Sequence, residues 1–428
     1  TAREVLKVLQ EERIDLIISM LNVGEIDTFN LAKMLKARHP NIPIVVLTPF
    51  SREVSIRLQR EDLSAIDYVF CWLGNADLLL AIIKLIEDKM NADHDILDVG
   101  VQAILLVEDS VRYYSSFLPN IYKIVFRQAR SFMTEALNEH HRMLRMRGRP
   151  KILMATTYED AVALYRKYQN NIIGVISDIS YKVDNQRDHL TKAGLRLCKL
   201  IRTEDPNMPF LLQSSELSNK LYADELGVSF VHKYSKTCNI EIRDYIINNF
   251  GFGDFVFRDP DTMAEVGRAT DLSQLQQLIM TVPDRSLVYH TSRNDISKWL
   301  NARAIFSIAQ LFKPMTLKDF KTTDDARNFL FYAISAYRLS KGRSIIAKFD
   351  RNTFDEYKFF SRIGEGSIGG KARGLAFINQ VIKDYNLFHK FDDVLISIPR
   401  TVVISTDLFD EFMESNNLYG IALQDVED

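Results

Sequence analysis

Short apolar runs alternate with amphipathic segments of helical length over roughly the first 250 residues, and this alternation constrains the fold more than any other feature. Parallel strands that are covered on both faces by crossover helices are continuous apolar runs rather than alternating ones. The pattern therefore predicts an α/β protein with doubly wound parallel sheets.

The alternation occurs twice. The first copy, residues 1–95, opens with the amphipathic stretch AREVLKVLQEERID and continues through the runs LIISML, IVVLT and YVFCWL. It starts at a helix, and the sequence starts at Thr1, so we expect its first strand to be missing. The second copy, residues 100–252, contains the runs AILLVED, KILMAT, IIGVISD, PFLLQSS and VSFVHK. We therefore expect two tandem doubly wound α/β domains that join near residues 92–100.

The second copy carries an insertion that should be one long helix. Pro119 is typical of a helix start, and Gly148 with Pro150 is typical of a stop, so the helix would span 119–147. If continuous it would be about 43 Å long, which means that it protrudes or folds back.

Basic residues gather around the end of this insertion: Arg142, Arg145, Arg147, Arg149 and Lys151. We expect a solvated helix end, where cations complement the helix dipole, rather than a nucleic-acid site. The whole chain has 54 Lys and Arg against 56 Asp and Glu, a formal net charge of −2. No global field therefore directs it to nucleic acid or to an anionic membrane.

Beyond Phe252 the alternation stops. Residues 253–345 read as a helical connector, to which the sequence assigns no function. Residues 346–428 follow a third pattern, in which a glycine-rich stretch and a helix separate IIAKF from TVVIS.

Polar residues end the apolar runs of the second copy. Glu108 and Asp109 end the first run, and Asp178, Ser214 and Lys233 end the third, fourth and fifth. The carboxyl ends of parallel strands meet at one edge, where ligands bind. Converging carboxylates suit Mg²⁺, and an ammonium with a hydroxyl suits an incoming phosphoryl group. The set therefore indicates a site that converts a carboxylate into an acyl phosphate.

This arrangement resembles the receiver domain of two-component response regulators, over about residues 101–250. The resemblance implies a flavodoxin-like fold. The resemblance implies that Asp178 is the phospho-acceptor, that Ser214 and Lys233 assist it, and that Phe230 is the switch aromatic. It also implies a Mg²⁺ site made by Glu108, Asp109, Asp178 and the backbone of Ser180. The inserted helix departs from the family pattern, as does Tyr234, where the family usually has proline.

The first copy lines up with the same family less well. Met20 stands at the acceptor position, Thr48 keeps the hydroxyl position, and Cys71 replaces the lysine. We interpret it as a degenerate receiver that serves packing or dimerisation. The alternative is an unrelated α/β domain.

The glycine-rich stretch IGEGSIGGKARGLAF contains Gly364-x-Gly366-x-x-Gly369. It is no P-loop, because Ala372 follows Lys371. Glycines let the backbone approach a phosphate, and Lys371 adds charge at a helix start. Together with SIPRTVVISTDLFDEFM, the stretch GGKARGLAF resembles the start of the nucleotide-binding domain of phosphoenolpyruvate synthase and pyruvate phosphate dikinase.

That second resemblance implies that residues 346–428 begin an ATP-grasp domain in which Gly369, Gly370 and Lys371 contact ATP. The segment Ile398-Pro399-Arg400-Thr401 departs from the family wording. The rest of the ATP-grasp domain, the phosphohistidine domain and the pyruvate-binding barrel are not in this sequence. An isolated glycine-rich turn is the alternative interpretation.

The two resemblances together lead us to expect the regulatory N-terminal portion of a phosphoenolpyruvate synthase-like phosphotransferase. The alternative is a stand-alone response regulator that acts through protein contacts. The first would be incomplete as an enzyme without downstream catalytic domains, and the reading frame beyond Asp428 distinguishes the two. Either receives its phosphoryl group from a sensor histidine kinase or a small phosphodonor, and homo-oligomer formation stays open.

The scattered cysteines Cys71, Cys198 and Cys238 form no disulfide framework, which favours a cytoplasmic location. No apolar run reaches the roughly 18 residues of a membrane helix, so we expect no membrane partner.

Overall fold

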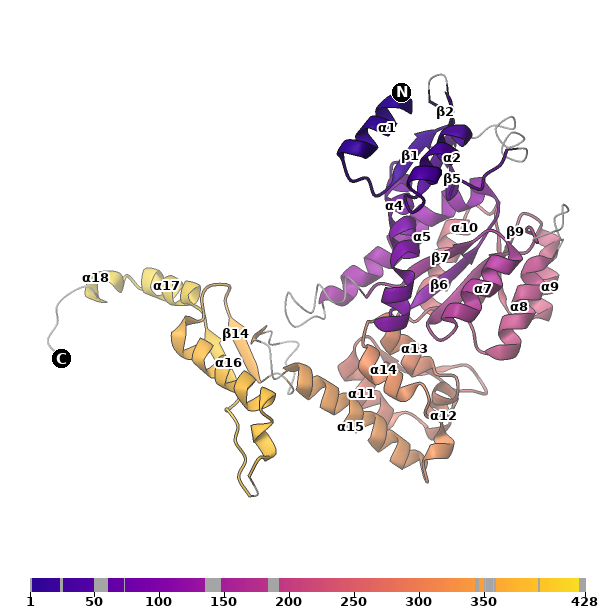
Figure 1. Cartoon of the computed structure of the whole chain (residues 1–428). Coiled ribbons are helices and arrows are strands. Elements are labelled where there is room, and N and C mark those ends of the chain that lie inside the picture. Colours follow the sequence, from indigo (N-terminus) through magenta and orange to yellow (C-terminus); the bar gives the residue numbers. More distant parts are fainter. Residues whose placement is uncertain are drawn as a thin grey trace. The chain divides into compact units, whose positions relative to one another are not determined.

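We describe the protein from a computed structural model (Figure 1). It describes residues 2–23, 26–49, 61–72, 74–134, 148–183, 192–342, 346–349, 351, 357, 359–391 and 393–422. The chain divides into two compact units. The N-terminal unit is Thr1–Gln128 with Gly148–Phe252, and the C-terminal unit is Ala129–Arg147 with Gly253–Asp428. Among the described residues, no helix combines the length and the apolar character that crossing a membrane requires.

The N-terminal unit begins with a small parallel sheet in the order β1-β4-β5. Its elements are α1 (Ala2–Glu11), β1 (Ile17–Met20), β2 (Asn22–Val23), β3 (Ile26–Asp27), α2 (Thr28–Arg38), β4 (Ile44–Pro49), β5 (Tyr68–Trp72), α4 (Asp77–Ala92) and the π-helical turn η1 (Asp93–Asp98). Leu31 and Leu35 of α2 are buried against Ile44 of the central strand. The segment SREVSIRLQR between β4 and β5 lies outside the described residues.

A five-stranded parallel sheet in the order β10-β9-β8-β6-β7 forms the rest of this unit (Figure 1). Its elements are β6 (Ala103–Val107), α5 (Val111–Thr134), β7 (Lys151–Ala155), α7 (Tyr158–Tyr168), β8 (Ile172–Asp178), α8 (Ala193–Glu204), β9 (Phe210–Ser214), η2 (Leu217–Asn219), α9 (Lys220–Glu225), β10 (Ser229–His232) and α10 (Cys238–Asn249). Strands β6 and β9 are buried along their whole length, as strands covered on both faces are. The predicted class, α/β with parallel sheets, is confirmed.

The helix after β6 does not begin at Pro119, so that prediction is wrong. It begins at Val111, directly after the acidic pair, and Pro119 lies in its interior. An interior proline removes one backbone hydrogen bond and costs about 3 kcal/mol. Tyr114, Leu118, Ile121 and Val125 continue one buried face across the proline, and this burial outweighs the loss. Residues 135–147, the rest of the predicted helix, lie outside the described residues.

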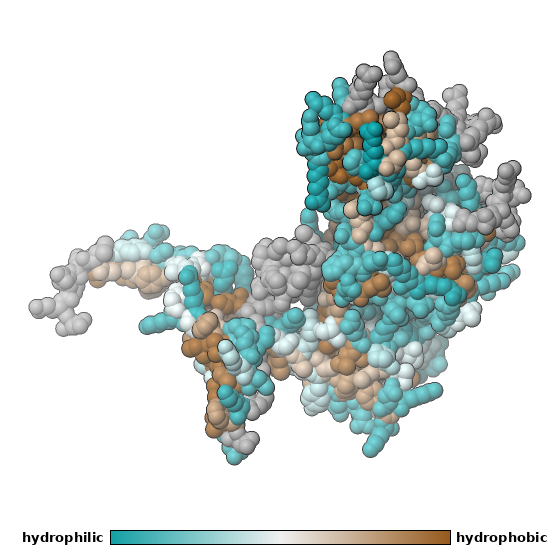
Figure 2. Space-filling model, viewed as in Figure 1, coloured by the Kyte–Doolittle hydropathy of each residue, from teal (hydrophilic) through white to brown (hydrophobic). Residues whose placement is uncertain are grey.

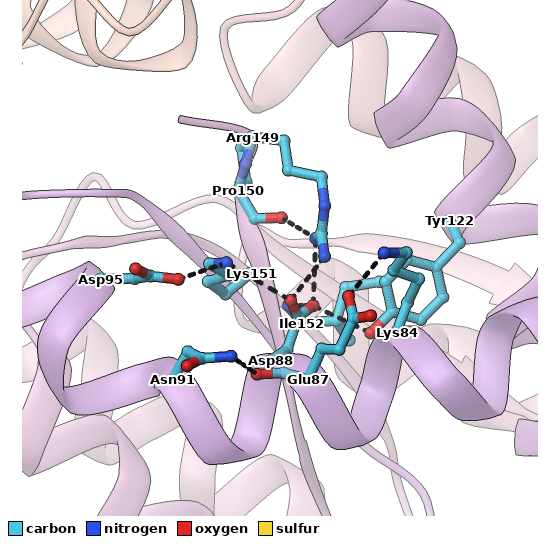
Figure 3. Close-up of polar contacts among 10 residues, drawn as sticks. All are labelled: Lys84, Glu87, Asp88, Asn91, Asp95, Tyr122, Arg149, Pro150, Lys151 and Ile152. Atoms are coloured by element: carbon cyan, nitrogen blue, oxygen red, sulfur yellow. Dashed lines mark hydrogen bonds and ion pairs between the residues drawn. The ribbon is translucent and has the colours of Figure 1, made fainter. Parts of the chain in front are cut away.

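A buried ion cluster joins α4 to β7 (Figure 3). The Asp88 carboxylate has no exposed surface, and the Arg149 guanidinium donates to it at 2.7 Å and 3.2 Å. The Tyr122 hydroxyl and the backbone N–H of Ile152 also donate to Asp88, at 2.9 Å and 3.0 Å. Lys151 lies 2.5 Å from Asp95. The sequence led us to expect a solvated helix end here, and for Arg149 and Lys151 that expectation is wrong. Both side chains are buried and paired with acids. The other basic residues of that run lie outside the described residues.

The C-terminal unit opens with an antiparallel pair of strands, β11 (Phe255–Arg258) and β12 (Glu265–Ala269). The prediction that residues 253–345 are helical is wrong here, because Phe255 and Phe257 alternate inward as a strand. The elements that follow are α11 (Leu272–Thr281), α12 (Asp284–Ser292), α13 (Asp295–Ala302), α14 (Phe306–Phe312), η3 (Leu317–Asp319) and α15 (Thr323–Gly342). They pack around Trp299, whose indole N–H donates to the carbonyl of Gly253 at 3.0 Å.

The same unit ends in a three-stranded parallel sheet in the order β13-β14-β15. Its elements are β13 (Ile346–Lys348), β14 (Phe360–Ile363), α16 (Gly369–Asp384), η4 (Leu387–His389), β15 (Thr401–Ile404), α17 (Thr406–Ser415) and α18 (Tyr419–Ala422). Large apolar side chains remain exposed here, including Phe377, Leu395 and Ile404, which are 66–70% exposed. Figure 2 shows apolar surface on this part of the chain.

Candidate functional site

The carboxyl edge of the five-stranded sheet collects the polar residues that end its strands. The chain leaves β6 for β7 on one side and later reaches β8 on the other, so the connections diverge at β6. Open α/β sheets bind ligands at such a point. Backbone hydrogen bonds continue one residue past the strands. Glu108 N–H donates to Ala155 at 3.1 Å, and Lys233 N–H donates to Ser214 at 2.9 Å. These bonds hold Glu108 and Lys233 level with Asp178, the last residue of β8.

Lys233 bridges two of the predicted carboxylates. Its Nζ lies 2.6 Å from Glu108 Oε2 and 2.7 Å from Asp178 Oδ2. The side chains of Lys233 and Glu108 are almost fully buried, whereas that of Asp178 is 12% exposed. Asp178 Oδ1 accepts a hydrogen bond from the Ile179 N–H at 2.7 Å. Asp178 is therefore fixed at both oxygens and is the carboxylate of the bridge that is open to a reactant.

Burial sets the electrostatics of this bridge. Burial raises the pKa of Glu108 to about 8, although Lys233 acts in the opposite direction. Burial lowers the pKa of Lys233, but the carboxylates of Glu108 and Asp178 together raise it by more than burial lowers it, so the net shift is upward. The lysine therefore stays charged at neutral pH.

Asp109 completes an acidic group with the other two carboxylates. Glu108, Asp109 and Asp178 each offer an oxygen, and these oxygens lie within 4.8 Å of one another. Neighbouring ligands of an octahedral Mg²⁺ are about 3 Å apart and opposite ones about 4.2 Å, so these oxygens would have to draw together by up to about 2 Å to bind it directly. Burial favours the protonated form of Glu108, whereas a divalent cation beside it would favour the ionised form. Three ionised carboxylates against one ammonium would then leave two negative charges, which one divalent cation neutralises. The residues present thus fit a hard divalent cation.

The other predicted residues lie around this edge. Ser214 is the last residue of β9, and its hydroxyl accepts hydrogen bonds from the Glu216 N–H at 3.1 Å and from Asn219 Nδ2 at 2.8 Å. Ser180 is half-buried in the loop that follows Asp178. Phe230 is half-buried and packs against the core of the sheet.

Sequence reasoning missed two residues that shape the site. The Tyr113 ring, from the first turn of α5, lies over Lys233 with Nζ 4.2 Å from its centroid. Gly194 lies so close to the end of β8 that a Cβ there would come within 2.0 Å of the Asp178 carbonyl oxygen. The misplaced helix start concealed Tyr113, and the motif AGLRLCKL gave no sign that its glycine contacts Asp178.

The first sheet places Met20, Thr48 and Cys71 near its corresponding strand ends. Met20 is 53% exposed, Thr48 is fully buried, and the Cys71 N–H donates to Ser115 Oγ of α5 at 2.9 Å. Within the described part of the chain, the group of carboxylates suited to an ion lies at the second sheet alone.

The glycine-rich stretch forms the loop between β14 and α16. Glu365 N–H donates to Asp407 Oδ2 at 2.7 Å, and Ser367 N–H donates to Thr406 Oγ1 at 3.0 Å. Gly369 and Gly370 open α16, and Lys371 is exposed in its first turn. Apart from its chain neighbours and its own helix backbone, no atom of the described residues lies within 4 Å of a Cβ built at Gly370. Packing against the described residues therefore does not explain that glycine.

A scan against models of known protein families finds no match to this sequence. A search of curated proteins finds no similar protein.

Proposed function

We propose that residues 101–250 form a receiver domain that accepts a phosphoryl group on Asp178. The observation that carries this proposal is the Lys233 ammonium held between Glu108 and Asp178 at the carboxyl edge of the sheet. The strand order supports it. Numbered within this half, the order is 2-1-3-4-5, which is that of flavodoxin-like sheets.

The chemistry requires little beyond these residues. An Asp178 oxygen attacks the phosphorus of an acyl phosphate or a phosphohistidine; a new O–P bond forms, and the donor's bond to phosphorus breaks. Glu108, Asp109, Asp178 and the Ser180 backbone would hold Mg²⁺, which would neutralise the charge of the phosphoryl oxygens. The Lys233 ammonium would pair with one phosphoryl oxygen, and the Ser214 hydroxyl would donate a hydrogen bond to another.

The test uses the purified full chain with acetyl phosphate, in the presence and absence of Mg²⁺. Intact-mass spectrometry should show one added phosphoryl group that depends on Mg²⁺ and is lost in Asp178→Asn. Asp224→Asn, an exposed acid on α9 of the same unit, is the matched control and should be labelled like the wild type. An unmodified wild type, or equal labelling of Asp178→Asn, would refute the receiver chemistry.

We further propose that the chain regulates a phosphoenolpyruvate synthase-like phosphotransferase, in which Gly369, Gly370 and Lys371 bind ATP phosphates. The open space at Gly370 and the exposed Lys371 support this proposal, since both leave room for a ligand at the start of α16. The exposed apolar side chains of the same sheet favour a domain that is completed by further protein.

A stand-alone response regulator acting through protein contacts is the competing proposal. Titration with ATP and Mg²⁺ distinguishes the two, with Lys371→Ala as the test variant and Lys383→Ala, at the other end of α16, as its control. Weak binding that Lys371→Ala alone abolishes supports the phosphotransferase. Equal binding by both variants, or none by the wild type, favours the stand-alone regulator.

A further inference from the structure

Lys233 is held by an aromatic ring as well as by two carboxylates. The Tyr113 centroid lies 4.2 Å from Nζ, well within the distance at which a cation is attracted to a ring face. The side chain of Lys233 is only 2% exposed, so this contact is largely desolvated and therefore stronger than one at the surface. Tyr113 thus takes part in placing the ammonium.

The ring of Tyr113 is itself held by neighbouring rings. Phe117, one helical turn later in α5, stacks on it with 6.0 Å between centroids and 14° between planes. Tyr234, the residue after Lys233, meets it edge-on at 6.2 Å. Burial and a hydrogen bond with Tyr234 raise the pKa of Tyr113, so the ring is neutral at physiological pH. The ring is therefore fixed from the helix and from the lysine's own loop.

Phosphoryl transfer would require Lys233 to change partners. In the structure the ammonium contacts both Glu108 and Asp178, and an acceptor in use needs it beside a phosphoryl oxygen. A lysine side chain has many rotamers, and holding it in one orientation lowers the entropy lost at the transition state. A ring face allows the ammonium to turn without losing the contact, because the attraction is less directional than a hydrogen bond.

We propose that Tyr113 is a positioning residue for phosphoryl transfer to Asp178, and that it acts through Lys233. This inference rests on the proposed receiver function. The ring keeps the ammonium at the acceptor before transfer and at the phosphoryl group afterwards. Its loss should slow phosphorylation and shorten the life of the acyl phosphate, whereas the cation site of Glu108, Asp109 and Asp178 should be unaffected.

The experiment compares Tyr113→Phe with Tyr113→Leu in the full chain. Acetyl phosphate with Mg²⁺ provides the phosphorylation rate, and intact-mass spectrometry after donor removal provides the acyl phosphate lifetime. Tyr113→Phe keeps the ring face and should stay within about twofold of the wild type. Tyr113→Leu should be roughly tenfold slower, the effect of a partly desolvated cation–ring contact. Its Mg²⁺ affinity, measured by calorimetry, should be unchanged.

Two further variants separate positioning from a structural effect. Phe117→Leu removes the stacked ring that does not touch Lys233 and should have a smaller effect than Tyr113→Leu. In a Lys233→Met background, Tyr113→Leu should have no further effect, because effects that act through one group are not additive. Hydrogen exchange over β6 and β7 shows whether each variant is folded. If Lys233→Met does not fold, the comparison of Tyr113→Phe with Tyr113→Leu in the wild-type background decides the question.

The outcomes distinguish this inference from the proposed function. If the wild type is not phosphorylated at Asp178, the receiver function itself is refuted. If the wild type is phosphorylated and Tyr113→Leu matches it in rate and lifetime, the positioning role is refuted. The same holds if Tyr113→Leu slows transfer equally with and without Lys233, or if Tyr113→Phe is as slow as Tyr113→Leu.

Discussion

Asp88→Asn removes the charge from a carboxylate with no exposed surface while almost preserving its shape (Figure 3). The Arg149 guanidinium, 8% exposed, then lacks a counter-charge in the interior. Breaking a buried pair by removing one partner costs about 3–5 kcal/mol. The asparagine oxygen still accepts one hydrogen bond, which places the expected loss near the lower end, about 3 kcal/mol.

Native-state hydrogen exchange measures this loss in the full chain. Strands β6 and β7 should become about 100-fold less protected, because each 1.4 kcal/mol is a factor of ten. Peptides from α11 to α15 provide an internal reference that should not change. Glu87→Gln, on the neighbouring residue of α4, is the matched control, because Glu87 is 45% exposed and pairs with Lys84. Its expected effect is below about 1 kcal/mol.

A double variant tests the pairing itself. Arg149→Met in the Asp88→Asn background removes the unpaired charge and should restore part of the lost protection. The combined loss should be smaller than the sum of the single losses by at least about 1.5 kcal/mol. Additive losses, or an Asp88→Asn chain that exchanges like Glu87→Gln, would show that the cluster does not hold α4 against β7.

Three further predictions follow from the other sites. Gly194→Ala would place a methyl group 2.0 Å from the Asp178 carbonyl oxygen, so it should destabilise the sheet edge by about 1–3 kcal/mol, measured by hydrogen exchange. It should also slow the phosphorylation of Asp178, measured by intact-mass spectrometry. Beryllofluoride, a stable mimic of the phosphoryl group, should change exchange over residues 253–345 or the oligomeric state measured by light scattering; identical data at confirmed occupancy would leave the receiver without an output. The purified chain should show no pyruvate-dependent consumption of ATP, because Lys371 alone does not position a triphosphate, and sustained turnover would contradict the domain assignment.

The parallel sheets could be predicted from the sequence because strands buried on both faces have a strong signal. AILLV and FLLQS are buried at every position, and their polar successors reach one edge whatever the details of the helices. That is why Glu108, Asp178 and Lys233 could be selected without a structure. Their separations depend on the register of strands that are distant in sequence, which no local pattern contains.

Interactions set by tertiary packing could not be predicted. Asp88 sits in LIEDKM beside the exposed Glu87, and nothing in the sequence indicates that one acid is buried against an arginine 61 residues away. Pro119 favoured a helix start by local propensity, yet the buried face of α5 outweighs that preference. The same error concealed Tyr113, which only a helix beginning at Val111 brings over Lys233.

The first turn of α5 places three consecutive residues against two different sheets. Tyr113 lies over Lys233 of the candidate site, whereas the Tyr114 hydroxyl donates to the Val69 carbonyl and Ser115 Oγ accepts from the Cys71 N–H, both of β5. Within one helical turn these residues cannot move independently, because the backbone hydrogen bonds of the turn fix their relative positions. Under the proposed function, a displacement of Lys233 towards a phosphoryl group would therefore act on the edge of the first sheet through α5. The first sheet has methionine, Met20, at the position that corresponds to Asp178, so it has no carboxylate there to phosphorylate. The contacts of Tyr114 and Ser115 with β5 would nevertheless let phosphorylation of Asp178 change the conformation of this sheet.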